Sequence, residues 1–187
     1  MNKETINKYD KDNMIEVIKK LYFHIEHSFD IISESNLKKR NSIKNILICG
    51  MGGSAIGGDF VKTVLKSDLE IPIVVNRDYD LPKWISENSL VIICSYSGNT
   101  EETISCYNST VNSNIRPIVI SSGGHILKDA KENNYDFVQL PVGIQPRAAF
   151  GYSASLLLLT LVKIGIINDK YSNQLFNSIG SIKSASS

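Results

Sequence analysis

Short apolar runs, separated by turn and helix signals, dominate the middle of this chain. Five of these runs show no alternation of apolar and polar positions: Asn45–Gly50, Ile71–Val75, Leu90–Ser95, Arg116–Ser121 and Asp136–Leu140. A run without alternation is typical of a strand covered on both faces, as in a parallel sheet. Helical patterns fill the gaps at about 54–66, 100–113 and 123–133, and the stretch 80–87 predicts a single turn. This order predicts an α/β fold, a three-layer αβα sandwich with a five-stranded parallel sheet.

Further helices are predicted on both sides of this region. Near the N-terminus, apolar residues recur at steps of three and four positions, which predicts one helix with Asn13 and Glu16 as its capping box. The apolar face of that helix consists of Met14, Ile18, Leu21, Tyr22, Ile25 and Phe29. A long apolar helix is predicted near 150–165, and a last helix fades into a Ser-Ala-Ser-Ser tail. We expect an N-terminal helical segment that packs on a main domain, followed by a C-terminal helix or tail, with the bounds 1–35, 36–168 and 169–187.

One segment raises the question of a membrane span. Ala148–Ile167 is mostly apolar and about as long as a bilayer crossing. It contains Lys163, Gly151 and Gly165, so we interpret it as a helix buried between the sheet and another protein surface, with no membrane role. The polar N-terminus, Met1–Glu4, has no apolar signal-peptide core, which predicts a cytoplasmic protein.

Composition and charge exclude several classes of protein. Of the 187 residues, 42% are apolar and 21% are charged, which is the composition of a globular protein. Lysine and arginine number 20 against 19 acidic residues, so the net charge of +1 lacks the electrostatic signature of a nucleic-acid-binding protein. The dense basic run Lys38-Lys39-Arg40 is interpreted as a solvated loop before the first strand.

The cysteine and histidine positions indicate neither a disulfide framework nor a metal centre. Cys49, Cys94 and Cys106 form no Cys-x-x-Cys pair, and the first two lie in apolar runs where a thiol acts as a small buried hydrophobe. His24 and His27 are three residues apart on the predicted first helix, a spacing that allows a shared metal, but no third ligand accompanies them. We therefore interpret them as surface or boundary histidines and expect no metal.

Ligands bind at the carboxyl ends of the strands in open α/β sheets, and the first strand ends in an unusual sequence. Residues 50–59 read Gly-Met-Gly-Gly-Ser-Ala-Ile-Gly-Gly-Asp. Glycines let the backbone approach a ligand closely and turn into a helix, whose N-terminus favours an anion. The Gly-x-Gly-x-x-Gly dinucleotide template fits with Ala55 in place of its third glycine, but no acid is clearly placed at the end of the second strand, where Asn76-Arg77-Asp78 stands. A nicotinamide site therefore stays open as an alternative, whereas a Walker loop is excluded because Gly-Lys-Ser/Thr is absent.

The third strand ends in a turn rich in hydroxyl groups. Residues 95–103 read Ser-Tyr-Ser-Gly-Asn-Thr-Glu-Glu-Thr, which places Ser95, Ser97 and Thr100 on one short turn before a helix. Each hydroxyl donates one hydrogen bond, and together with helix amides they can surround a phosphate without a positive charge. The alternative is an ordinary helix cap made by Asn99 with Glu102. Three hydroxyls and a glycine at a strand end favour the phosphate interpretation.

These two segments, together with Gln145-Pro146-Arg147-Ala148-Ala149, resemble the SIS (sugar isomerase) domain family over about residues 10–180. More narrowly, they resemble the first SIS domain of the bifunctional phosphoglucose/phosphomannose isomerases. The Ser-x-Ser-Gly-x-Thr piece is shared by SIS domains in general, whereas the glycine segment and the Gln-Pro-Arg-Ala-Ala piece are more specific to the bifunctional enzymes. The resemblance implies a flavodoxin-like sheet and a reaction that needs no cofactor.

The resemblance also implies a substrate and roles for individual residues. The reaction would interconvert glucose 6-phosphate or mannose 6-phosphate with fructose 6-phosphate through an enediolate. Arg147 would stabilise the negative charge of that enediolate, and the alternative for this side chain is a structural ion pair. The implied substrate-binding residues are Gly52, Gly53, Ser54, Ser95, Ser97, Gly98, Asn99 and Thr100.

The chain departs from the family in its length. Family members are roughly twice as long, and their base and ring-opening groups (a Glu, a His and a Lys) come from a second SIS domain, with the His donated by the partner subunit. Here Glu101 and Glu102 read as first-turn helix acids, and nothing identifies His125 as a base. We expect the phosphosugar-binding half of an isomerase, associated as a homodimer or with a complementing second SIS domain. Because helix 148–167 would then lack its usual cover, self-association through it is predicted. The alternatives are a non-catalytic SIS module that senses a sugar phosphate and, below it, an NAD(P)-binding oxidoreductase domain.

Overall fold

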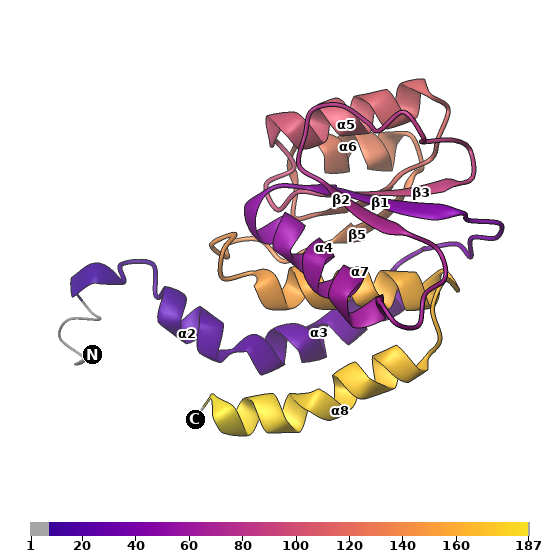
Figure 1. Cartoon of the computed structure of the whole chain (residues 1–187). Helices are drawn as coiled ribbons and strands as arrows, with labels where there is room; N and C mark the ends of the chain where they lie inside the picture. Colours follow the sequence, from indigo (N-terminus) through magenta and orange to yellow (C-terminus); the bar gives the residue numbers. More distant parts are fainter. Residues whose placement is uncertain (1–7, 187) are drawn as a thin grey trace.

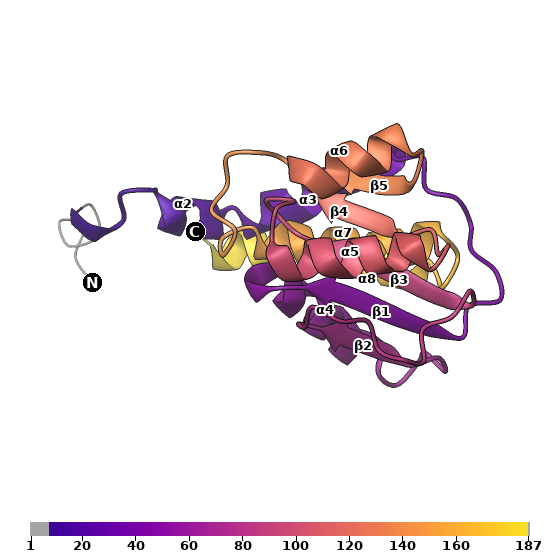
Figure 2. The ribbon, with the colours of Figure 1, turned by 90° about the horizontal axis from the view of Figure 1, so that it is seen from above.

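Five parallel strands form one sheet in the order β2-β1-β3-β4-β5, as Figure 2 shows from above. The computed structural model describes residues 8–186. The strands are β1 (Asn45–Gly50), β2 (Ile73–Asn76), β3 (Ser89–Cys94), β4 (Ile118–Ser121) and β5 (Asp136–Gln139). The predicted five-stranded parallel sheet is confirmed, and its order reverses between β1 and β3.

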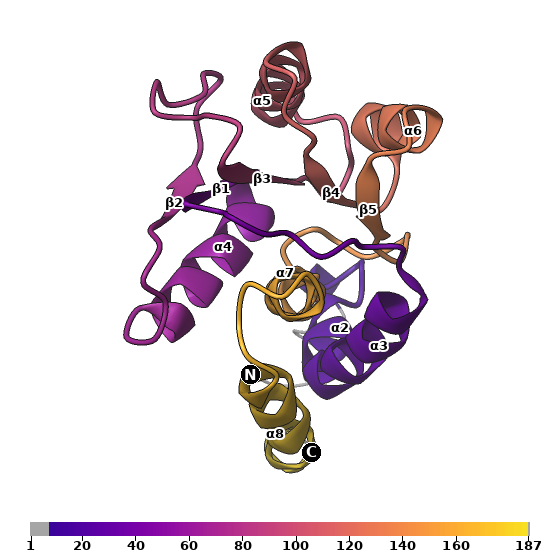
Figure 3. The same ribbon diagram turned by 90° about the vertical axis from the view of Figure 1, so that its right-hand side faces the viewer.

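Helices cover both faces of the sheet, so the predicted three-layer sandwich is also confirmed (Figure 3). Helices α5 (Glu101–Asn112) and α6 (Gly124–Glu132) lie on one face, and α4 (Gly52–Leu65) and α7 (Phe150–Lys163) lie on the other. Successive side chains of a strand point to opposite faces. In β1, Ile46 and Ile48 therefore join the core beneath α4 and α7, while Leu47 and Cys49 join the core beneath α5 and α6. Coverage on both sides explains why the strand sequences do not alternate.

The predicted first helix is divided in two. Helix α2 (Met14–Lys19) ends one residue before α3 (Leu21–Glu34) begins. Asn13 makes no capping hydrogen bond, so the predicted capping box is wrong. The carboxylate of Asp10 accepts instead from the amides of Met14 (2.7 Å) and Ile15 (2.9 Å). A carboxylate accepts a stronger hydrogen bond from a free helix amide than the neutral side chain of an asparagine does. This explains why Asp10, and not Asn13, accepts from the first amides of α2.

Helix α7 is the central element of the second helical layer. Ten of its 14 residues are buried, and α3, α4 and α8 (Lys170–Ala185) of the same chain pack against it. Figure 1 shows α3 and α8 beneath α7, on its side away from the sheet. The expectation that this helix is uncovered is therefore wrong, because two terminal helices occupy its outer side. Self-association of the chain stays a prediction. No helix in the described part of the chain combines the length and the apolar character that a bilayer crossing requires.

A ring stack and a hydrogen bond, both to Tyr152, join α3 to α7. The ring of His24 stacks on that of Tyr152 with centroids 4.5 Å apart, and His27 Nδ1 lies 2.9 Å from the Tyr152 hydroxyl oxygen. His24 is only 4% exposed, so its interpretation as a surface or boundary residue is wrong, whereas His27 does lie at the boundary. Burial, with smaller effects from the charges of His27 and Lys20, lowers the pKa of His24 to about 4. His24 is therefore a neutral core residue near pH 7.

The smaller expectations have mixed outcomes. Lys38 and Lys39 are exposed as predicted, but Arg40 is half-buried and donates to Asp136 at 2.7 Å. All three cysteines are buried and unpaired. The stretch 80–87 contains a turn, closed by the Ile85 amide on the Pro82 carbonyl (3.1 Å). The expectation for the polar segment 1–4 concerns residues outside the described part.

Close approach of α4 to α7 depends on Gly57. A Cβ atom at this position would lie 2.9 Å from Ser153 Oγ and 3.1 Å from the Ser153 carbonyl carbon. Gly57→Ala should therefore force the helices apart and lower the free energy of unfolding by about 1–3 kcal/mol, measured by urea denaturation. Gly180→Ala is the matched control, because no heavy atom lies within 4 Å of its added Cβ. It should raise stability by about 0.5–1 kcal/mol through helix propensity. Equal effects of the two substitutions would contradict this account of the α4–α7 contact.

Candidate functional site

The two segments singled out by sequence meet at the carboxyl edge of the sheet, where the strand order reverses. Gly50 ends β1 and pairs with Cys94 at the end of β3. A Cβ on Gly50 would lie 3.0 Å from the Cys94 carbonyl oxygen, so the two strand ends are in direct backbone contact. In open α/β sheets this reversal is where the crossover connections leave on opposite faces and a ligand can enter.

The glycine segment is the first turn of a helix and not a separate loop. Helix α4 begins at Gly52, two residues earlier than predicted, with Met51 as its extended N-cap. The early start leaves the first amides of α4 without intrahelical acceptors at the sheet edge. Ser54 is half-buried in the same turn.

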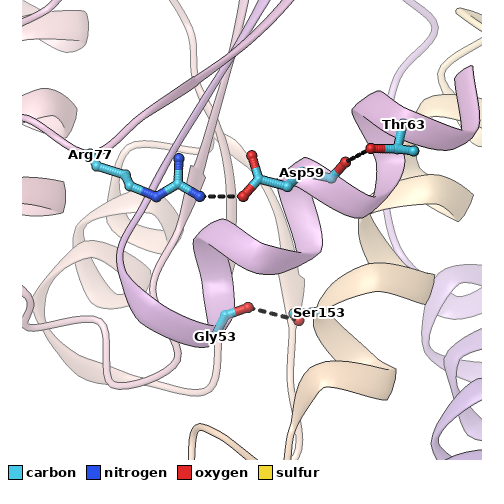
Figure 4. A network of polar contacts seen from close by, with 5 residues as sticks. All are labelled: Gly53, Asp59, Thr63, Arg77 and Ser153. Atoms are coloured by element: carbon cyan, nitrogen blue, oxygen red, sulfur yellow. Dashed lines mark hydrogen bonds and ion pairs between the residues drawn. The ribbon is translucent and has the colours of Figure 1, made fainter. Parts of the chain in front are cut away.

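Arg147 lies beside this turn. A Cβ on Gly53 would lie 2.8 Å from the Pro146 carbonyl oxygen and 3.8 Å from the Arg147 Cα, so only glycine allows this approach. Figure 4 shows the same turn next to α7, with Ser153 Oγ donating to the Gly53 carbonyl oxygen at 3.4 Å. The Arg147 side chain is exposed and, among residues 8–186, has no ion-pair partner. The ion-pair alternative for this residue thus has no support in the described part.

The hydroxyl turn is a compact cluster with one open side. Ser95 is buried, and its Oγ accepts from the Gly98 amide (3.1 Å) and lies 2.9 Å from Thr100 Oγ1. Ser97 Oγ accepts from the Asn99 amide at 3.2 Å. Ser97 and Asn99 are exposed, so the turn is not closed over by other side chains. The Ser97 hydroxyl, which accepts from a backbone amide and keeps its own proton, is therefore available to donate to an anion from solvent.

Asn99 does not cap α5. The N-cap of that helix is Thr100, which makes no side-chain capping hydrogen bond, and Asn99 Oδ1 accepts instead from the amide of His125 at 2.9 Å. The alternative of an Asn99–Glu102 cap is therefore wrong. Asn99 caps the next helix, α6, and this joins the hydroxyl turn to the turn after β4.

The β4–α6 turn, to which the sequence analysis gave no binding role, lies against the hydroxyl turn. The Ile126 amide donates to the Gly98 carbonyl at 3.2 Å. Gly98 has φ +69°, and a Cβ there would lie 1.8 Å from the Gly123 carbonyl oxygen. The two turns are therefore packed backbone to backbone, and the N-termini of α5 and α6 converge on the same point. The pair Gly123-Gly124 before a helix was the available signal.

Other acids and the exposed His125 lie around this edge without forming a recognisable base. Glu101 and Glu102 are in the first turn of α5, as predicted, and Glu101 accepts from the Tyr79 hydroxyl at 3.3 Å. His125 is at the start of α6. The described residues contain no group of three or more His, Cys, Asp or Glu side chains able to hold a metal.

The end of β2 lacks the acid of a dinucleotide site. Asn76 is the last residue of the strand, and its amide donates to the carbonyls of Asp78 (3.3 Å) and Asp80 (3.1 Å). Arg77 forms an ion pair with Asp59 of α4, drawn in Figure 4. The position that would bind a ribose hydroxyl therefore carries an amide already engaged with the protein backbone.

A cavity of about 930 Å³ lies elsewhere, beside the edge strand β5 and the chain after α3. Its lining includes Glu34, Lys38 and Lys131 and none of the residues of the two strand-end segments. The candidate site is therefore an open surface at the sheet edge and not this cavity.

The packing of the two turns gives a matched test. In Gly98→Ala, the added methyl group would overlap the Gly123 carbonyl, and alanine would have to adopt the left-handed φ of Gly98. The free energy of unfolding should therefore fall by about 2 kcal/mol or more. Gly123→Ala is the control, because its φ of 174° is extended backbone and no heavy atom lies within 4 Å of the added Cβ. Chemical denaturation of both variants checks the prediction. An unchanged free energy of unfolding in the Gly98→Ala variant would show that the two turns are not packed as described.

Comparisons with known proteins agree with this geometry. The sequence profile of the SIS domain matches residues 41–139, more than half of the chain. The chain is 39% identical over 155 residues to a bifunctional phosphoglucose/phosphomannose isomerase of Caldicellulosiruptor bescii, an alignment that covers 82% of this chain and 46% of the relative. It is 38% identical over 126 residues to the enzyme of that name from Aquifex aeolicus, covering 67% of this chain and 39% of the relative.

A solved structure shows the same fold. A provisionally named phosphosugar isomerase of Clostridium difficile superimposes with a TM-score of 0.69 at 20% identity, covering 90% of this chain and 52% of that one. The chain spans only about half the length of the curated relatives it matches. It belongs to the SIS domain family and is homologous to the bifunctional phosphoglucose/phosphomannose isomerases.

Proposed function

We propose that this chain is the phosphosugar-binding half of an aldose–ketose isomerase. Its ligands would be fructose 6-phosphate, glucose 6-phosphate and mannose 6-phosphate, which it would bind for interconversion through an enediolate. The observation that carries this proposal is the open hydroxyl turn between Ser95 and Thr100, on which the N-termini of α5 and α6 converge. The names of the homologous isomerases support the choice of substrate.

The phosphate is bound by neutral donors. Ser97 and Asn99 are exposed on the turn, and the Ser95–Thr100 hydroxyl pair lies behind them. Hydroxyls and amides at helix N-termini satisfy a dianion without a counter-charge, because the helix dipole favours negative charge there. Gly98 closes the turn, because its amide donates to Ser95 Oγ and so holds that hydroxyl in place.

The sugar carbons would lie toward the first turn of α4. Gly52, Gly53 and Ser54 border this region, and Arg147 stands beside Gly53 without a competing partner in the described part. A guanidinium beside a developing enediolate lowers the barrier, because its positive charge stabilises the negative charge that forms. Arg147 is thus proposed as the catalytic residue that this chain supplies, with no metal or organic cofactor.

Transfer of a proton between C1 and C2 also needs a base within hydrogen-bond reach of the substrate. We propose that the base and the ring-opening groups come from a second SIS domain, in the same protein or in an associated subunit. A SIS module that only senses a sugar phosphate would share the binding site and lack this complement. The two functions therefore differ in activity and not in binding.

Binding is tested first by isothermal titration. Fructose 6-phosphate should bind the wild-type chain, whereas NAD and NADP should not. Ser97→Ala and Thr100→Ala should each weaken binding by about 10- to 100-fold, because a hydrogen bond to a charged group contributes about 1.5–3 kcal/mol. Ser113→Ala, at the opposite end of α5, is the control, since its hydroxyl donates only to the Ser109 carbonyl. Unchanged affinity in both site variants would refute the phosphate assignment.

Activity is tested by complementation. The second SIS domain of a homologous isomerase, expressed separately and added to this chain, should restore conversion of fructose 6-phosphate to glucose 6-phosphate. Arg147→Ala should abolish the restored activity, because removing a preorganised charge typically costs about 100-fold or more in rate. Binding without any restored activity would favour the sensing module over the isomerase.

A further inference from the structure

The Tyr96 hydroxyl links the phosphate turn to the segment that carries Arg147. Tyr96 stands between Ser95 and Ser97, and its hydroxyl donates to the Pro141 carbonyl at 2.9 Å. The same oxygen accepts from the Ile144 amide at 2.8 Å. One phenol group therefore holds both ends of the turn that leads from β5 to Arg147.

The side chains of this segment are mostly exposed. Leu140 and Ala148 are buried at its two ends, but between them the side chains of 142, 143 and 145–147 are all exposed, and Val142 is 73% exposed. Ile144 is only half-buried. Residues 145–149 form a turn that leads into α7, in which the Gln145 carbonyl accepts from the amides of Ala148 (2.9 Å) and Ala149 (3.2 Å). Between β5 and this turn, the Tyr96 hydroxyl binds the backbone at 141 and 144. The direction from which the chain enters the Arg147 turn therefore depends on the Tyr96 hydroxyl.

Tyr96 is itself held firmly. Its carbonyl oxygen accepts from the amide of Ser122 at 3.0 Å and from the hydroxyl of Ser122 at 2.6 Å. Its ring packs against the core beneath α7. Because the backbone and the ring of Tyr96 are both held in place, its hydroxyl can keep residues 141–144 in one position.

We propose that Tyr96 is a positioning residue that sets the distance between the phosphate turn and Arg147. The inference rests on the proposed function, because it assigns Tyr96 to the alignment of two groups that bind one sugar phosphate. Without the hydroxyl the ring still fills its place, but residues 141–144 sample more conformations, and the turn that carries Arg147 loses its fixed approach from β5. The guanidinium must then be ordered when the sugar binds, and this ordering lowers affinity. The phosphate turn itself does not use the hydroxyl and stays intact.

The test compares two ligands in four proteins: wild type, Tyr96→Phe, Arg147→Ala and the double variant. Fructose 6-phosphate is titrated calorimetrically, and inorganic phosphate is titrated while the amide signals of residues 97–100 are followed by NMR. Tyr96→Phe should bind fructose 6-phosphate about tenfold more weakly and bind inorganic phosphate within about twofold of wild type. In the Arg147→Ala background the same change should cost nothing further, because the group it positions is gone. Exchange of the Ile144 amide should also become faster in Tyr96→Phe.

Tyr107→Phe is the control, since it removes a buried phenol bound to Asp129 on the far face of the sheet. It should lower stability and leave both affinities unchanged. Equal weakening of both ligands by Tyr96→Phe, or additive effects with Arg147→Ala, would overturn the positioning role. A wild-type chain that does not bind fructose 6-phosphate would refute the proposed function itself. Wild-type binding with an unaffected Tyr96→Phe variant would refute only this inference.

Discussion

The reversal of strand order between β1 and β3 is the constraint on which the rest of this molecule depends. Parallel strands require right-handed crossovers, so β1 sends α4 to one face and β3 sends α5 to the other. The two connections separate at the carboxyl edge and leave backbone amides facing solvent. The glycine turn, the hydroxyl turn and the Arg147 segment all gather at this one place, although they are far apart in the sequence.

Close backbone approaches at glycine residues bring these segments together. Gly53 meets the Pro146 carbonyl, Gly98 meets the Gly123 carbonyl, and Gly57 meets the backbone of Ser153. At each contact, the backbone of a neighbouring segment occupies the space that a Cβ atom would need. A side chain larger than that of glycine would therefore clash there. Such an arrangement suits a ligand recognised through amides and hydroxyls, because the donors are fixed before the ligand arrives.

Local patterns predicted the strands well and the connections less well. The bounds of β1 are as predicted, since its residues are apolar on both faces and glycine ends the run. Helix α4 begins earlier than its glycines suggested, because the contact with Pro146 comes from a segment that local sequence does not reveal. The same reason explains why Asn99 caps α6 and why α7 is covered by α3 and α8. Helix propensity and spacing describe neighbours along the chain, whereas these contacts join residues distant along it.

The packing of α7 between α3 and α8 has a consequence for synthesis of the protein. The two helices that cover α7 come from opposite ends of the described chain, one made before the sheet and one after it. On the ribosome, the leucine-rich surface of α7 therefore stays partly open to the cell until the residues of α8 have left the exit tunnel. During that interval a chaperone, or a second nascent chain, competes with α8 for the same leucines.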